Sequence, residues 1–319
     1  MIAVLCGGVG AARFLAALAR VVEPVDTVGI VNTADDTVLH GLAISPDLDT
    51  VTYTLADAID PDRGWGLSDE SWRAMEALQR YANVRPRGSS AAPTWFNLGD
   101  RDLATHFYRT ARLGEGAVLS EVTTEICDAW DVRQRLVPMS DQTVATVVTL
   151  ADGSDVSFQE YFVKLQHAVP VTAVRFAGAA EAALAPGLDE VLKTAECIVI
   201  APSNPIVSIG PIRALAAVDP ILIGRRSSVV AISPIVGGTA LKGPADRMLS
   251  ELGHESSVVG VARLYASIAA TLVIDPVDAH LAAAVEAAGM RAVITPSVMS
   301  SPEIGSQLAR VSLRAASAE

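Results

Sequence analysis

Short apolar runs recur along the chain, and each is bounded by glycine, proline or polar residues. Runs without polar alternation are typical of parallel strands that are buried on both faces of a sheet. Apolar residues at helical spacing follow most of these runs, so strands and helices are expected to alternate. The predicted strands cover residues 2–6, 27–31, 171–176, 197–201, 229–232, 271–274 and 292–294. The pattern predicts an α/β fold with a doubly wound, mostly parallel, Rossmann-like sheet.

The segment from about residue 55 to residue 169 departs from this alternation. Helical patterns over 68–81 and 121–130, together with a helix that starts near Gly99 and Asp100, precede a hairpin predicted from 144–150 and 156–158. We interpret this segment as a largely helical insertion that covers the ligand edge of the sheet. The predicted division is therefore 1–54 for the first part of the Rossmann-like core, 55–169 for the insertion and 170–319 for the remaining core.

Composition and charge narrow the classes of function. Hydrophobic residues make up 50% and aromatic residues 5% of the 319 residues, which predicts a sizeable core with small side chains. A formal charge of −12 without a long Lys/Arg run argues against a nucleic-acid partner. No apolar run reaches about eighteen residues, and Met1 leads directly into a strand, so we expect a cytoplasmic protein without a membrane partner. Cys6, Cys127 and Cys197 are expected to be packed thiols.

Three glycines, Gly7, Gly8 and Gly10, follow the first predicted strand and open a helix. Backbone N–H groups and the positive end of the helix then face a ligand, and an anion fits best. The turn departs from the dinucleotide fingerprint, because Arg13 stands at the third glycine and Asn32 stands where an acid ends the second strand. The P-loop pattern is absent. The turn favours a phosphate or a nucleotide other than NAD as the ligand. A purely structural role for the turn remains the alternative.

Four aspartates follow the second predicted strand in the stretch 32–50, which we expect to form a loop. They are Asp35, Asp36, Asp47 and Asp49. Carboxylates this close repel one another unless a cation or hydrogen bonds offset the charge, so the stretch is a candidate divalent-metal site. Two alternatives remain open. The residues could be turn and cap residues, with Asp49 capping a helix from residue 51, or the Asp-x-Asp pair could belong to a nucleotide-sugar transferase.

Two later strand ends carry hydroxyl, amide and glycine groups. Ser203 and Asn204 follow the strand at 197–201, and Ser233 follows the strand at 229–232. Because the carboxyl ends of parallel strands meet at one edge, these groups are expected near the glycine turn. Groups that both donate and accept hydrogen bonds suit nucleotide recognition. Proline-stabilised turns remain the alternative.

Eight motifs, in this order, make the chain similar to the 2-phospho-L-lactate transferase family of deazaflavin coenzyme F-420 biosynthesis, particularly its actinobacterial branch. The motifs run nearly from end to end and are LCGGVGAARF, VNTADD, SPDLDTVTYTL, IDPDRGWG, LGDRDLATH, SFQEYFVK, APSNPIVSIGPI and SPIVGG. The chain departs from the family at Ala11 and Ala34, where relatives often have glycine. These changes affect fine loop geometry.

The resemblance implies a transfer between two substrates. The ribityl hydroxyl of the deazaflavin Fo attacks a phosphorus of a guanosine diphosphate-linked three-carbon acid, either lactate or enolpyruvate, and GMP leaves. It also implies a Mg²⁺-dependent homodimer. A related family of non-catalytic nucleotide-sugar-binding regulators shares the glycine turn and the core, but Asp100, Arg101 and Thr105 favour the transferase.

Residue roles are carried over from the same resemblance. We expect Asp35 and Asp49 to hold the metal, with Asp36 and Asp47 beside them, and Asp49 or Asp36 to accept the hydroxyl proton. Asp49 and Arg101 are expected to bind Fo. The other expected substrate contacts, several of them to the guanosine diphosphate, are Gly7, Gly8, Gly10, Asn32, Thr33, Asp47, Ser203, Asn204 and Ser233.

Overall fold

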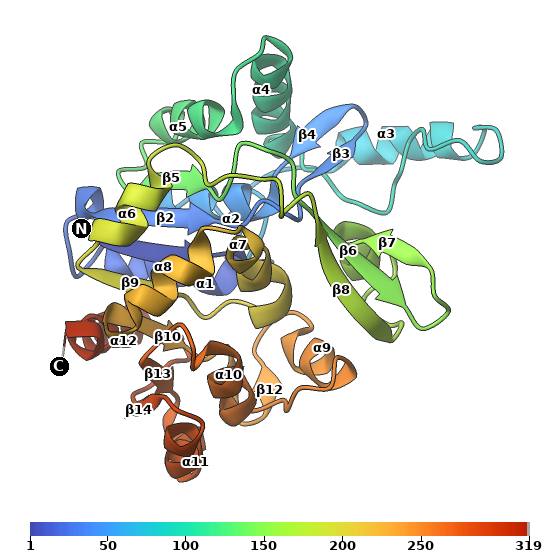
Figure 1. Ribbon diagram of the computed structural model, residues 1–319. Coiled ribbons are helices and arrows are strands. Elements are labelled where there is room, and N and C mark those ends of the chain that lie inside the picture. The colour runs from blue at the N-terminus through green and yellow to red at the C-terminus, as the bar shows by residue number, and fades with distance from the viewer. Residues whose placement is uncertain (318–319) are drawn as a thin grey trace.

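Seven parallel strands form the central sheet of the computed structural model, which describes residues 1–317 (Figure 1). In spatial order they are β14 (Arg291–Ile294), β13 (Thr271–Ile274), β10 (Val229–Ile232), β9 (Cys197–Ile200), β1 (Ile2–Cys6), β2 (Thr27–Val31) and β5 (Arg135–Pro138). When the seven strands are numbered by their order in the chain and read from the β5 edge, the sheet order is 3-2-1-4-5-6-7. Its first six positions follow the order of doubly wound dinucleotide-binding sheets. The strand order therefore reverses between β1 and β9.

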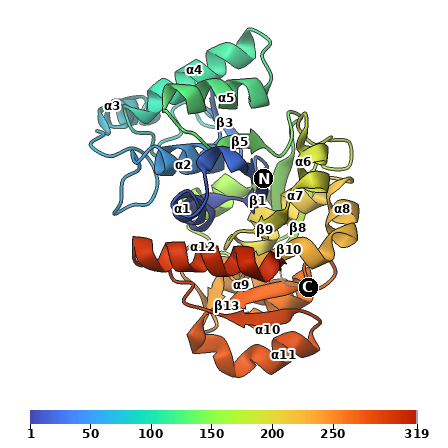
Figure 2. The ribbon, with the colours of Figure 1, turned by 90° about the vertical axis from the view of Figure 1, so that its left-hand side faces the viewer.

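Helices cover both faces of this sheet, which confirms the predicted doubly wound fold. In β1, Ile2, Val4 and Cys6 point into one apolar layer, whereas Ala3 and Leu5 point into the other. The first layer is covered by α1 (Gly8–Leu18), α2 (Pro46–Leu55), α5 (Leu119–Ala129) and α12 (Pro302–Ser317). Figure 2 shows α12 lying along the sheet beside α1. The second layer is covered by α6 (Leu188–Thr194), α7 (Gly210–Ala214), α8 (Val218–Gly224), α9 (Ala245–Glu251), α10 (Val258–Tyr265) and α11 (Ala282–Ala287).

One strand predicted for the central sheet lies elsewhere, and one central strand was not predicted. Residues 171–176 do form a strand, β8 (Val171–Ala177), but it pairs antiparallel with β6 (Ala145–Leu150) in a separate sheet that also contains β7 (Asp155–Ser157). The middle of β8, including Arg175, is largely exposed, as in an antiparallel strand with one solvated face. Strand β5 is short and ends in proline, which the edge of a sheet tolerates. The division at 55 and 169 remains a prediction, although β5 lies inside the 55–169 segment.

The stretch 32–50 is not the loop that we expected. It contains the hairpin of β3 (Thr37–Leu39) and β4 (Leu42–Ile44), whose turn residues His40 and Gly41 both have positive φ. Helix α2 then starts at Pro46, five residues earlier than predicted, with Asp47 and Asp49 in its first turn. Proline suits the first helical position, and acidic residues near a helix N-terminus interact favourably with the helix dipole. Asp49 therefore lies within the helix and does not cap it.

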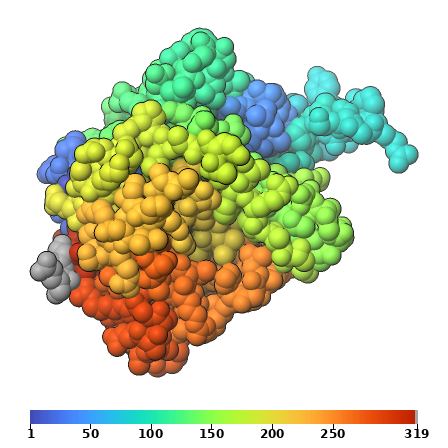
Figure 3. Space-filling view, in the orientation of Figure 1, coloured from blue at the N-terminus to red at the C-terminus, as the bar shows by residue number. Residues whose placement is uncertain are grey.

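The remaining elements agree broadly with the sequence pattern. The helix predicted at 121–130 is α5 and the predicted hairpin is β6–β7, whereas the helix predicted from residue 68 begins later, as α3 (Arg73–Ala82). Helix α3 and the exposed connection after it project from the molecule (Figure 3). The other elements are α4 (Asp102–Gly114), β11 (Ile235–Val236), β12 (Thr239–Ala240), the 3-10 turns η1 (Pro24–Asp26), η4 (Arg226–Ser228) and η5 (Pro276–Leu281), and the π turns η2 (Glu160–Lys164) and η3 (Pro205–Ile209).

Two predictions about burial and membrane contact can be compared with this fold. Cys6, Cys127 and Cys197 are buried and unpaired, as expected for packed thiols. Within residues 1–317, no single helix is long and apolar enough to cross a membrane. One bent pair of helices, Pro205–Ala214 with Val218–Gly224, would qualify on length and composition alone.

Candidate functional site

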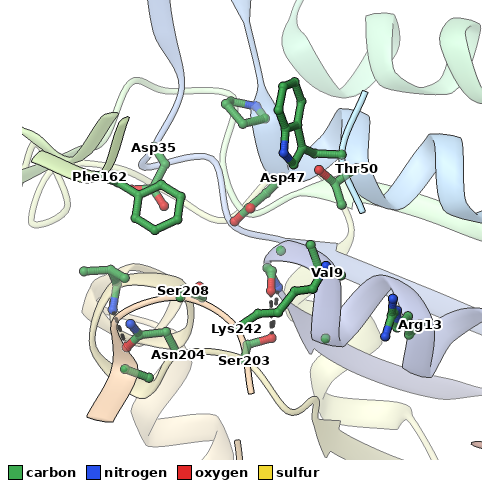
Figure 4. A pocket seen from close by; sticks show the side chains of 18 of the residues that line it. Val9, Arg13, Asp35, Asp47, Thr50, Phe162, Ser203, Asn204, Ser208 and Lys242 are labelled. Atoms are coloured by element: carbon green, nitrogen blue, oxygen red, sulfur yellow. Dashed lines mark hydrogen bonds between the residues drawn. The ribbon is translucent and has the colours of Figure 1, made fainter. Parts of the chain in front are cut away.

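A cavity of about 890 Å³ opens at the carboxyl ends of β1 and β9, where the strand order reverses (Figure 4). Ligands bind at this point in doubly wound sheets. Nine of the predicted site residues line it, namely Gly7, Gly8, Gly10, Asp35, Asp47, Asp49, Ser203, Asn204 and Ser233. Asn32 is buried next to the cavity, and its side chain donates hydrogen bonds to two of these aspartates. Thr33, Asp36 and Arg101 lie outside the described lining.

The glycines of the first turn let three segments of the chain approach one another closely. A Cβ atom on Gly7 would lie 2.7 Å from Asp47 Oδ2, and one on Gly10 would lie 2.2 Å from the carbonyl oxygen of Pro202. Gly8 has a φ of +70°, a backbone conformation that residues with a side chain rarely adopt. Packing within the protein therefore requires these glycines, in addition to any contact with a ligand.

Hydrogen bonds hold the turn to the loop after β9. Ser203 Oγ donates to the carbonyl oxygen of Gly7 at 2.9 Å. Asn204 Oδ1 accepts from the backbone N–H of Ile206 at 2.9 Å and so caps the π turn η3. Ser233 Oγ donates to its own loop, at the carbonyl oxygen of Ile235. Ser203 and Ser233 thus shape the cavity wall. The amide N–H₂ group of Asn204 contacts a methionine sulfur at 3.8 Å and is otherwise available to a ligand.

Two carboxylates share one amide group on the opposite wall. Asn32 Nδ2 donates to Asp35 Oδ2 at 3.0 Å and to Asp47 Oδ2 at 2.9 Å. Asp35 Oδ1 is buried and makes no hydrogen bond of normal geometry within residues 1–317. Burial, and then the charge of Asp47, raise the pKa of Asp35 well above its ordinary value, although the Thr146 hydroxyl is near enough to oppose the rise. Burial raises the pKa of Asp47 to about 6, against the lowering effect of the Asn32 hydrogen bond. Paired carboxylates with an unsatisfied buried oxygen fit a divalent cation.

Asp36 and Thr33 line a second cavity, of about 360 Å³, and not the first. Ser45 Oγ donates to Asp36 Oδ2 at 2.6 Å. Burial raises the pKa of Asp36 well above its ordinary value, and this hydrogen bond opposes the rise. Asp36 therefore lies behind the cavity wall, which does not favour direct contact with a substrate hydroxyl.

Asp49 faces the cavity, but both of its oxygens contact Arg109. Arg109 Nη2 donates to Asp49 Oδ1, and Nη1 donates to Oδ2 at 3.2 Å. Arg109 is 2% exposed, so this ion pair is buried. His106 Nε2 lies 3.2 Å from Asp102 Oδ2, and the Tyr53 hydroxyl donates to Asp102 Oδ1 at 2.6 Å. A connected polar network therefore holds Asp49 from behind.

Sequence reasoning assigned no role to Tyr53, His106 or Arg109. Asp102, His106 and Arg109 share one face of α4 at spacings of four and three residues. That spacing is the signal that could have identified them, although it also fits a solvated helix face. Arg101, in contrast, precedes α4 and donates from Nη1 to the Ser68 carbonyl oxygen at 2.7 Å.

The charge balance distinguishes two possible cation sites. One ligand atom each from Asp49, Asp102 and His106 lie within 4.8 Å of one another. A guanidinium already offsets the charge there, however, because Arg109 contacts Asp49. At Asp35 and Asp47, an amide is the hydrogen-bond donor shared by the two carboxylates. The second pair therefore fits a divalent cation better.

Aromatic side chains from distant segments line another part of the cavity. Trp65, Trp95 and Phe96 come from the segment between α2 and α4, and Phe158 and Phe162 come from the region of η2. The rings of Phe158 and Phe162 are stacked, with centroids 5.5 Å apart and an interplanar angle of 10°. Flat apolar walls of this kind suit a ring-shaped ligand. Sequence reasoning did not identify this wall.

Comparisons with known proteins agree over nearly the whole chain. The family profile described as 2-phospho-L-lactate transferase CofD matches residues 2–294. A Streptomyces avermitilis protein named phosphoenolpyruvate transferase is 42% identical over 316 residues, covering 98% of this chain and 97% of its own. A protein of that name from Mycolicibacterium smegmatis is 37% identical, with 98% and 97% covered. A crystal structure of a Bacillus halodurans protein covers 98% of both chains with a TM-score of 0.62, and at 15% identity it supports the fold alone.

Proposed function

Because the chain belongs to the 2-phospho-L-lactate transferase CofD family, and is a transferase of coenzyme F-420 biosynthesis, we propose that it transfers a phosphoenolpyruvyl group to the deazaflavin Fo. The donor is a guanosine diphosphate-linked three-carbon acid. The ribityl hydroxyl oxygen of Fo forms a bond to the phosphorus that carries the acid, and the bond from that phosphorus to GMP breaks. The names of the relatives favour enolpyruvate over lactate as the acid.

The observation that carries this proposal is a single cavity with two chemically different walls. The wall beside Gly7, Ser203 and Asn204 offers backbone and small polar groups, which suit a nucleotide. Aromatic side chains elsewhere in the lining, among them the stacked rings of Phe158 and Phe162, offer apolar surface that suits a deazaflavin ring. Two substrates that react with each other must occupy one cavity, and this cavity provides both surfaces.

We assign the divalent cation to Asp35 and Asp47, because Asp35 has a buried oxygen that makes no hydrogen bond of normal geometry within residues 1–317. When bound, Mg²⁺ offsets negative charge on the diphosphate. Arg109 fixes Asp49 at the cavity wall, which suits a carboxylate that accepts a hydrogen bond from a substrate hydroxyl. The predicted contact of Arg101 with Fo stays part of the proposal, since within residues 1–317 only Nη1 of its guanidinium is bonded, to the Ser68 carbonyl oxygen, and the other N–H donors are free for a ligand. A cytoplasmic homodimer is part of the same proposal.

A mass-spectrometric assay tests this function directly. The protein is incubated with Fo, with Mg²⁺ and with either the enolpyruvyl or the lactyl guanosine donor. We expect GMP and a phosphoenolpyruvyl-Fo product from the first donor, and no product in excess chelator. Asp35→Asn is expected to lower turnover strongly, whereas Asp128→Asn, an exposed change on α5 outside the cavity lining, leaves it unchanged. Absence of any Fo product with both donors contradicts the proposal.

Nucleotide choice provides a second readout in the same preparation. Guanine and adenine present opposite donor and acceptor groups at the six-position, so a matched site leaves polar groups unpaired with the wrong base. An unpaired buried group costs roughly 1 to 3 kcal/mol, which corresponds to about ten- to a hundredfold in affinity. We therefore expect GDP to compete with the donor far better than ADP. Equal competition by the two nucleotides contradicts a guanosine donor.

A further inference from the structure

We propose that Arg13 and Lys242 form the subsite that binds the phosphate groups of the nucleoside diphosphate, on the flank of α1 and not at its N-terminus. The identity of the nucleotide rests on the proposed function. The phosphate subsite itself can be tested without any nucleotide.

Two backbone N–H groups at the N-terminus of α1, those of Gly7 and Gly8, already interact with groups of the protein. The Asp47 carboxylate lies against this end, since a Cβ atom on Gly7 would be 2.7 Å from its Oδ2 atom. The backbone N–H of Gly8 interacts with the same carboxylate, and the N–H of Gly7 donates to Ser203 Oγ at 3.4 Å. A helix N-terminus favours a nearby negative charge, and here Asp47 provides one. Unless the divalent cation of the proposed function offsets its charge, Asp47 repels a phosphate at this end of the helix.

Two basic side chains of the cavity lining form no ion pair with any carboxylate of residues 1–317. The arginine and lysine residues of the lining are Arg13, Arg63 and Lys242. Arg63 forms ion pairs with Asp60 at 2.9 Å and Glu70 at 3.1 Å. Arg13 makes no side-chain hydrogen bond or ion pair with the residues from 1 to 317, and Lys242 Nζ donates to a carbonyl oxygen, that of Arg63, at 3.3 Å. Arg13 and Lys242 are therefore available to a ligand.

Both cations lie on the same flank of α1. An ideal Cβ atom on Gly64 would be 2.6 Å from Lys242 Nζ and 3.6 Å from Val9 Cγ1, so the ammonium group and Val9 approach one point. Val9 and Arg13 are four residues apart in α1, which places them on one helix face. Figure 4 shows Lys242 extending toward Val9, with Arg13 one turn further along the helix. A ligand that contacts one of these cations is thus near the other.

The chemistry of the two side chains matches a diphosphate. An arginine guanidinium can bind two phosphate oxygens at once, and a lysine ammonium acts as a mobile point charge. Arg13 stands where dinucleotide-binding turns have their third glycine, a position that those proteins use for close helix–strand packing. In this chain Gly10 already allows the close approach of Pro202, so the later position is free to carry a basic side chain.

Calorimetric titration with inorganic pyrophosphate and with GDP, both in buffer with Mg²⁺, tests this subsite. Arg13→Met and Lys242→Met remove the charge and retain much of the length. We expect each variant to bind both ligands at least about tenfold more weakly, since a charge-assisted hydrogen bond is lost. Arg13→Lys and Lys242→Arg should retain most of the affinity. All four changes are at exposed positions, so the thermal unfolding midpoint should stay the same.

Two matched variants control for the change of charge. Arg20→Met follows the end of α1, and Lys193→Met lies in α6; both side chains are exposed and outside the cavity lining, so neither should change affinity. Unaltered pyrophosphate binding in Arg13→Met and Lys242→Met overturns the inference, and so does failure of the unmodified protein to bind pyrophosphate at millimolar concentration. Weaker pyrophosphate binding in both variants, with equal affinities for GDP and ADP, supports the subsite and contradicts the guanosine donor.

Discussion

Replacement of Arg109 by methionine should destabilise the protein strongly, although the residue lies on a helix of polar composition. Arg109 is buried and donates to both oxygens of Asp49. Methionine fills a similar volume without charge, so the variant leaves the Asp49 carboxylate buried without its partner. Removal of one member of a buried ion pair costs about 3 to 5 kcal/mol.

The expected change in the unfolding midpoint follows from the length of the chain. Unfolding entropy of about 2.1 cal/mol/K per residue gives, for 319 residues, roughly 0.7 kcal/mol/K. The Arg109→Met variant should therefore unfold about 4 to 8 °C below the unmodified protein. Arg112→Met, three residues later in α4, is the matched control, since its side chain is 31% exposed and paired with Glu125 at 2.9 Å. An exposed pair contributes about 0 to 1 kcal/mol, so the control should shift by less than about 2 °C.

Differential scanning calorimetry of four proteins tests the assignment. They are the unmodified protein, Asp49→Asn, Arg109→Met and the double variant. Because the double variant removes both buried charges together, it should be more stable than the sum of the two single losses predicts. A midpoint for Arg109→Met no lower than that for Arg112→Met would refute the reasoning, as would strictly additive losses in the double variant.

Two further predictions concern the glycine turn and the acidic wall. Gly10→Ala should lower the unfolding midpoint and weaken GDP binding, because its Cβ atom would lie 2.2 Å from a backbone oxygen, whereas Gly114→Ala, where no atom lies within 4 Å, should be neutral or slightly stabilising in the same melt. Since burial raises the pKa of Asp47 to about 6, the folded state binds more protons than the unfolded state above about pH 4, and stability should fall as pH rises toward 6 and slightly beyond. Urea titrations without divalent cations should show a smaller decline over this pH range for Asp47→Asn, and an unchanged decline would contradict the raised pKa.

The sheet and its ligand edge could be predicted because a strand that is buried on both faces needs a continuous apolar run, as in β1. The doubly wound order then brings the carboxyl ends of β1, β2 and β9 together, which is why Gly7, Asp35 and Ser203 line one cavity despite their separation in sequence. Strand β8 was placed in the wrong sheet because its apolar residues, read alone, do not reveal that Arg175 and its neighbours face solvent.

The residues that support the site from behind could not be identified by pattern alone. Helix α4 is polar on average, and a row such as Asp102, His106 and Arg109 is more often a solvated face. These side chains are buried only because α4 packs on β4 and brings Arg109 against Asp49 of α2. The aromatic wall is a similar case. Trp95 and Phe96 lie outside regular elements, so no periodicity indicates which way their rings point.

The division of labour between the acidic residues follows from how α2 begins. Because Pro46 is the first residue of the helix, Asp47 lies in its first turn and against the N-terminus of α1. Residues two apart on a helix do not share a face, so Asp49 points elsewhere and pairs with Arg109. One carboxylate therefore has a guanidinium partner. The other shares the Asn32 amide with Asp35 and interacts with the backbone N–H of Gly8, but no cationic side chain pairs with it among residues 1–317. The carboxylate pair with the weaker charge compensation gains more from a divalent cation, which is why our proposal assigns the metal to Asp35 and Asp47 and leaves Asp49 as the fixed acceptor beside them.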